Sequence, residues 1–146
     1  MKIGFTGTRN GLTPAQRAQV KLELDRRAGQ IEQAHHGGCC GGDEEFHELL
    51  HWTGVVAPGK IHVHWCDLEG HQSAAVRGDR QAYWYAERPP LSRNRDIACA
   101  VDLLIVAPKN YRWSRSGTWA TYNYAVKVGV PVLIVFPDGT TGTEAI

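Results

Sequence analysis

The sequence predicts an α/β fold: a single domain with a parallel β-sheet of about five strands and helices on both faces. Three observations predict it. Short apolar runs alternate along the chain with segments of helical periodicity, which is the order of elements in a parallel sheet. Two of the runs, 101–107 and 130–136, are almost continuously apolar, as strands buried on both faces are. The length of 146 residues fits one domain with a substantial core.

The first strand and the first helix carry the clearest local signals. Residues 2–6 form a short β-branched and aromatic run that ends in a turn-forming cluster at 7–11. Thr13 then precedes Pro14, and Gln16 follows three residues after Thr13, which is the pattern of a capped helix start. We expect this helix to continue to about residue 28.

The other elements follow in order along the chain. They are a strand at 31–36, a helix at 43–52, a strand at 60–65, a helix at 91–100, a strand at 101–107, a helix at 117–127 and a strand at 130–136. Between them, residues 66–90 are predicted to be a long inserted loop, and residues 140–146 a loose tail.

Composition and charge narrow the classes of function. The formal net charge of +1 provides no overall field for attracting nucleic acid or an anionic membrane, so we expect neither as a direct partner. No apolar run approaches the roughly 20 residues that span a bilayer. The four cysteines lack C-x-x-C spacing, which favours reduced thiols and a cytoplasmic location.

The loops that follow the strands are the candidate binding site, because parallel α/β folds bind ligands beyond the carboxyl ends of their strands. Three of these loops combine glycines, hydroxyls or arginines, and two of them lead into helix N-termini, whose N–H groups bind oxyanions. The candidate phosphate-binding residues are Gly7, Thr8, Arg9, His36, Gly37, Gly38, Gly41, Gly42, Arg115, Ser116, Gly117 and Thr118.

Four other side chains suit a nucleotide ligand. Arg93 and Arg95 stand at the start of the helix that leads into a buried strand, so one of them can point over the site and bind a phosphate bidentately. Tyr111 and Trp113 lie in a loop at the same edge of the sheet and are candidates for stacking on a base.

Histidines and cysteines in and beside the glycine loop raise a metal site as an alternative. The candidate ligands are His36, Cys39, Cys40 and His47. Vicinal cysteines rarely both reach one ion, and no tetrahedral ligand spacing is present. We therefore expect no metal and no cofactor.

The sequence resembles the SLOG superfamily, which is related to the LOG, or "lysine decarboxylase-like", proteins. The resemblance rests on residues 5–9, on the glycine loop that ends in Gly42-Asp43, on residues 93–108 and on Ser116-Gly117-Thr118. It is strongest for the small members encoded by phages and prophages. It implies a Rossmann-like fold, a nucleotide or NAD-derived ligand, a bacterial or phage-infected bacterial cytoplasm, and a homo-oligomer.

The resemblance also implies what the site does. LOG enzymes hydrolyse the N-glycosidic bond of nucleoside monophosphates with an Arg and a Glu. Arg93 matches the position of that Arg, but Thr121 stands where the Glu is expected. A threonine cannot act as the base for water at neutral pH or stabilise an oxocarbenium ion.

Two functional hypotheses follow. The first is a sensor or sequestering protein that binds a nucleotide, an ADP-ribose-like molecule or a cyclic nucleotide signal without altering it. The second is a nucleotide-processing hydrolase, either an N-glycosidase (phosphoribohydrolase) or a phosphodiesterase, whose catalytic carboxylate has moved. Asp43 is the first candidate, acting with Arg93; the others are Glu44, Glu45 and Asp138.

Overall fold

The run Lys2–Gly7 forms β1 at the centre of the sheet in the computed structural model, which describes residues 1–145. β1 pairs in parallel with β2 (Gln33–His36) on one side and with β5 (Leu103–Ala107) on the other. The remaining strands are β3 (Ile61–Cys66), β4 (Tyr83–Arg88), β6 (Val132–Val135) and β7 (Thr141–Gly142).

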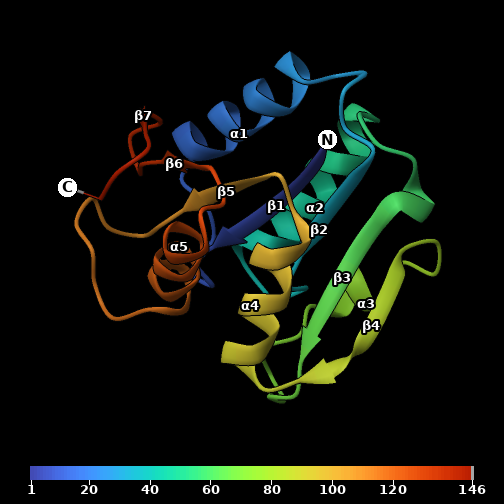
Figure 1. Cartoon of the computed structure of the whole chain (residues 1–146). Coiled ribbons are helices and arrows are strands. Elements are labelled where there is room, and N and C mark those ends of the chain that lie inside the picture. The colour runs from blue at the N-terminus through green and yellow to red at the C-terminus, as the bar shows by residue number, and fades with distance from the viewer. Residues whose placement is uncertain (146) are drawn as a thin grey trace.

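The seven strands lie in the order β4-β3-β2-β1-β5-β6-β7 (Figure 1). All neighbouring strands are parallel except β6 and β7, which are antiparallel. The chain therefore builds outward from β1 in one direction and then crosses to its other side. This switch between β1 and β5 is the place where open α/β sheets bind ligands.

Helices cover both faces of the sheet, as the sequence predicted (Figure 1). On one face lie α1 (Pro14–Arg26) and α2 (Gly42–Thr53), and on the other lie α4 (Pro90–Ala100) and α5 (Gly117–Val128). Phe5 of β1 stacks on Phe46 of α2 with ring centroids 4.5 Å apart. Burial of such aromatic pairs is the main force that holds a helix on a sheet.

The predicted helix start at Thr13 is confirmed. The hydroxyl of Thr13 accepts from the backbone N–H of Gln16, and the side-chain oxygen of Gln16 accepts from the N–H of Thr13. The amide of Gln16 also donates to the carbonyls of Pro108 at 2.7 Å and Val135 at 3.0 Å. Gln16 thus fixes the start of α1 against the carboxyl ends of β5 and β6.

The prediction of a loop over residues 66–90 is wrong. The segment contains the short helix α3 (Ala74–Arg77) and the edge strand β4, which pairs in parallel with β3. All six residues of β4 are exposed, so its sequence lacks the alternation that marks a half-buried strand. A 3-10 turn at Pro58–Lys60 precedes β3.

The predicted loose tail contains β7, which adds a second strand beyond the five that were expected. The N–H of Phe136 donates to the carbonyl of Thr140 at 2.8 Å and closes the turn between β6 and β7. Ile146 lies outside the described residues. Within residues 1–145, every helix is too short or too polar to cross a membrane.

Candidate functional site

A cavity of about 590 Å³ opens at the carboxyl ends of β1, β2 and β5, where the strand order switches. We call it the rim cavity. Its size is that of pockets that hold small organic ligands. It is lined by residues 5–10, Gly37, Cys39, Asp43, Leu68, His71, Pro90, Arg93, Asn94, Ile97, Lys109, Asn110 and residues 114–119.

All three predicted phosphate loops reach the rim cavity, the glycine loop among its predicted residues only through Gly37. Gly7, Thr8 and Arg9 line one part of it, and residues 115–118 at the start of α5 line another. Ser116 caps α5, because its hydroxyl accepts from the N–H of Trp119 at 3.2 Å. The first N–H groups of a helix have no partner within the helix, so this end of α5 attracts an oxyanion.

Arg93 forms part of the cavity floor. It extends from α4 and is only 7% exposed. Its Nη1 donates to the carbonyl of Gly37 at 2.7 Å and to that of His64 at 3.1 Å, and its Nε donates to the side chain of Asn94 at 2.9 Å. The guanidinium is therefore held rigidly against the ends of β2 and β3.

Gly37 separates Arg93 from Asp43. A Cβ at this position would overlap Nη1 of Arg93 and approach Oδ2 of Asp43 to 2.9 Å. Only a residue without a side chain lets the guanidinium and the carboxyl group come this close. The absence of a side chain at Gly37 is therefore a steric requirement of the site.

Asp43 lies in the first turn of α2, and its Oδ2 accepts from the N–H of Cys39 at 3.2 Å. Burial raises the pKa of Asp43 to about 6, although the nearby Arg93 and the N–H groups of Cys39 and Gly37 act in the opposite direction. A carboxyl group with such a pKa exchanges protons near neutrality, as a general acid or base must.

The raised pKa of Asp43 predicts a pH-dependent loss of stability. Above about pH 3.8 the unfolded chain releases this proton first, so the free energy of unfolding falls until the folded group ionises near pH 6. Between pH 4.5 and 7, wild type should lose about 2 kcal/mol relative to Asp43→Asn. Urea unfolding of both proteins across this range measures the difference; parallel pH curves would contradict it.

The remaining glycines of the predicted phosphate loop shape the backbone and do not line the rim cavity. Gly38 has φ +66° and packs against the ring of Trp65. Gly41 has φ +85°, and a Cβ there would overlap the backbone of Arg9. The N–H of Gly42 donates to the carbonyl of Thr8 at 2.8 Å, which joins the loop to the end of β1.

Four other predicted side chains also lie outside the cavity lining. His36 is fully buried and faces His47. Arg95 lies over the ring of Tyr124, 5.3 Å from its centroid. Tyr111 stacks on Phe136, and Trp113 is about half exposed. Both aromatics lie in the sequence between Asn110 and Ser114, which line the cavity, but neither aromatic forms part of its wall.

Asp43 is the single carboxylate in the cavity lining among residues 1–145. Glu45 accepts from the N–H of Leu12, and Asp138 accepts from the N–H of Thr140 at 3.0 Å. Glu44 borders a separate hollow. Thr121 is fully buried, and its hydroxyl donates to the carbonyl of Gly117 at 2.8 Å, so it does not replace the missing Glu.

The lining contains polar residues that the sequence did not single out, among them Asn10, His71, Asn94, Lys109 and Asn110. Lys109 and Asn110 lie two and three residues beyond the end of β5, so their place after a buried strand indicates the rim. His71 had no such signal, because it lies in the segment whose structure was predicted wrongly.

No protein-family model and no curated protein matches this sequence. Several solved structures share its fold. DNA processing protein A (DprA) from Helicobacter pylori, solved for its single-stranded DNA binding mode, has a TM-score of 0.65 at 19% identity, over 92% of this chain and 64% of that one. DprA from Streptococcus pneumoniae has a TM-score of 0.69 at 18% identity, over 91% and 49% of the two chains.

A molybdenum cofactor binding protein from the phototrophic bacterium Rippkaea orientalis has a TM-score of 0.65 at 17% identity, over 92% of this chain and 76% of that one. At such identities the likeness shows the fold alone, which is a Rossmann-like α/β fold. The chain spans less than two thirds of the length of either DprA.

The prediction that nucleic acid is excluded as a direct partner is wrong. It rested on a net charge of +1, yet the H. pylori protein with the same fold is described as binding single-stranded DNA. Net charge averages over the whole surface, whereas a phosphate responds to the local field. At the rim cavity, Arg9, Arg93, Lys109 and Arg115 supply positive charge against the one carboxylate of Asp43.

Proposed function

We propose that this protein binds a nucleotide phosphate in the rim cavity, carried either by a free nucleotide-derived molecule or by single-stranded nucleic acid. The observation that carries the proposal is the meeting of the Gly7–Arg9 turn and the N-terminus of α5, with Arg115, in one cavity. The turn offers hydroxyl and guanidinium donors, and the helix offers N–H groups. Together they complement the oxygens of one phosphate group.

The structural neighbours support this proposal without deciding the ligand. One is described as binding single-stranded DNA, and another as binding the molybdenum cofactor. Both kinds of ligand are held by proteins with this sheet. Membership of the SLOG superfamily belongs to the same proposal, because it rests on short motifs and on a fold shared at low identity.

Titration calorimetry tests the proposal with two groups of ligands: AMP, ADP-ribose, NAD and cyclic nucleotides on one side, and an oligothymidylate on the other. Arg115→Ala should weaken binding about 10- to 100-fold, the value of one charge-assisted hydrogen bond. Arg112→Ala is the matched control, because Arg112 is exposed in the same loop but does not line the cavity.

The two groups of ligands distinguish the source of the phosphate. If only the oligonucleotide binds, and its affinity falls steeply with salt, the ligand is a strand. If the small nucleotides bind and the oligonucleotide does not, the ligand is a free molecule. Absence of binding by either group at millimolar concentration, or equal binding by Arg115→Ala and wild type, contradicts the proposal.

Hydrolysis of the bound nucleotide is the second candidate function. It is favoured by one observation: the carboxyl group of Asp43 lines the cavity beside Arg93, and its pKa is raised to about 6. Chromatography of nucleotides incubated with the protein would then reveal a free base or a cleaved phosphodiester. The product should disappear with Asp43→Asn, and turnover by that variant at the wild-type rate removes Asp43 from the reaction.

A further inference from the structure

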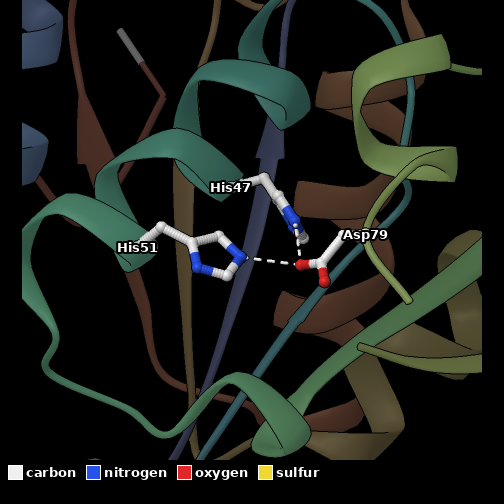
Figure 2. A group of neighbouring side chains, drawn as sticks. All are labelled: His47, His51 and Asp79. Atoms are coloured by element: carbon white, nitrogen blue, oxygen red, sulfur yellow. Dashed lines mark hydrogen bonds and ion pairs between the residues drawn. The ribbon is translucent and has the colours of Figure 1, made fainter. Parts of the chain in front are cut away.

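A second group of functional side chains lies on α2, one to two turns beyond Asp43. His47 and His51 are four residues apart, so both imidazoles lie on one face of the helix. Asp79, from the loop between α3 and β4, points between them (Figure 2). Its Oδ2 lies 2.8 Å from Nε2 of His47 and 2.7 Å from Nε2 of His51.

The spacing of these residues is that of a known kind of metal site. The sequence from His47 to His51 reads H-E-L-L-H, and H-E-x-x-H on a helix places two histidines to hold zinc, with the glutamate beside them. A third ligand from a distant segment completes such sites. Here one ligand atom from each of His47, His51 and Asp79 lies within 4.8 Å of the others.

The surroundings suit an ion with an open coordination position. A hollow of about 470 Å³ adjoins the three side chains and is also bordered by Glu44 and Glu48, and it shares no lining residue with the rim cavity. His47 and Asp79 are largely buried, while the His51 side chain is 38% exposed and leaves a route for entry. Glu48 also lies 3.5 Å from Arg17.

Outside the three ligands, His47 has a buried partner. Nδ1 of His47 lies 2.8 Å from Nε2 of His36. Histidines that bind metals usually donate the N–H of their second nitrogen to a neighbouring acceptor, which fixes the orientation of the ring. His36, which was a candidate for phosphate binding, therefore positions His47.

We propose that His47, His51 and Asp79 bind a divalent transition-metal ion, with zinc as the expected ion. Two imidazoles and one carboxylate form a donor set typical of zinc, and three protein ligands leave the fourth tetrahedral position to water. Such a site would tie α2 to the loop before β4. A water on the ion would face the hollow that Glu44 and Glu48 border, where a carboxylate can take up its proton.

Metal binding has a consequence for proton positions. The N–H of Gly38 donates to Nδ1 of His36 at 3.0 Å, so the proton of His36 is on Nε2 and points to His47. An ion on Nε2 of His47 requires a proton on Nδ1, which then donates to His36. His36 must move its own proton to Nδ1 and lose the bond from Gly38. Ion binding would therefore break the hydrogen bond between His36 and Gly38 of the glycine loop.

Titration of chelator-treated protein with Zn²⁺, followed by calorimetry, tests the site. We expect one ion per chain, and we expect His51→Ala and Asp79→Asn each to weaken binding by about 100-fold or more, since each removes a direct ligand. His62→Asn is the matched control, because His62 belongs to a separate histidine cluster with His35. This variant should bind Zn²⁺ as wild type does. His51 is partly exposed, so its variant retains the fold even if Asp79→Asn does not.

Co²⁺ substitution gives a second readout. The visible spectrum of the Co²⁺ protein should have the intensity of four-coordinate nitrogen and oxygen ligation, without the charge-transfer bands of thiolates. Thiolate bands that vanish with Cys99→Ser would place the ion on the exposed Cys99 instead and overturn the proposal. Failure of wild type to bind Zn²⁺, or equal binding by His51→Ala and wild type, overturns it as well.

Discussion

Lowering the pH from 7 to 5 is expected to cost the fold about 4 kcal/mol through two buried histidines, His35 and His64. Nδ1 of His35 lies 2.8 Å from Nε2 of His64 between β2 and β3. Burial, and then the neighbouring histidines, lowers the pKa of His35 to about 3 and that of His64 to about 4. In the unfolded chain both groups take up a proton near pH 6.5, so protons pull the equilibrium toward unfolding.

The direction of this pH effect follows from the lowered pKa values, and its size can be measured. A depressed histidine pKa stabilises the fold above pH 6.5, and this stability is lost as the pH falls toward the folded pKa. Each residue contributes about 2 kcal/mol between pH 7 and 5, while the ionisation of Asp43 offsets about 1 kcal/mol. Urea unfolding at the two pH values gives the net loss, to which the buried His36 adds in the same direction because burial also lowers its pKa.

One variant and one control test whether His64 causes this pH dependence of stability. His64→Gln should reduce the pH dependence by about 2 kcal/mol, because a glutamine does not titrate. His71→Gln should change it less than His64→Gln does, since His71 is partly exposed at the rim cavity. Wild-type stability that is the same at pH 5 and pH 7 would show that these histidines are not held neutral by burial.

Arg93→Ala is expected to destabilise the protein by about 2–6 kcal/mol, because two buried carbonyls would lose their donor at a cost of about 1–3 kcal/mol each. The carbonyls of Gly37 and His64 lose their donor, and Asp43 loses the nearest positive charge. Without that charge the pKa of Asp43 should rise further above its ordinary value. Nucleotide binding should be lost at the same time, because the cavity floor loses its rigid support.

Arg95→Ala is the matched control on the same helix. Arg95 is exposed and contacts the ring of Tyr124, so its removal should cost less than about 1 kcal/mol. Thermal unfolding by circular dichroism compares the two variants directly. Equal losses from both would show that burial of Arg93 adds nothing to stability.

Much of the architecture follows from the sequence because the buried strands and capped helices are locally specified. The apolar run that contains β5 has to be buried on both faces, and the Thr13 cap dictates where α1 begins. Alternation of strands and helices then places the loops at one edge of the sheet. The rim cavity lies at this edge, where the loops after the strands were expected to bind a ligand.

Residues 66–90 could not be predicted in this way. β4 is held by pairing with β3 along its backbone, and its side chains are exposed, so burial leaves no periodic pattern in the sequence. α3 is only four residues long, too short for a helical period. His71 and Asp79, which belong to the two sites, lie in this segment and were missed with it.

The sequence predicted which types of residue the site contains better than it predicted which side chains point into the cavity. Arg93 and Arg95 are two residues apart on α4, so only one of them can face the sheet. Ile97 follows Arg93 by four residues, which was the available signal that Arg93 lies on the buried face. The H-E-x-x-H spacing at 47–51 is visible in the sequence, but the third residue of the cluster, Asp79, lies in the segment 66–90, which the sequence did not bring close to α2.

Helix α2 has a mechanical consequence for the two sites. Asp43 stands in its first turn at the rim cavity, and His47 stands four residues later at the second hollow. A helix rises about 1.5 Å per residue, so the step of four residues separates these two positions by about 6 Å along the helix axis. A ligand held at Asp43 and an ion held at His47 would therefore share one helix as their support.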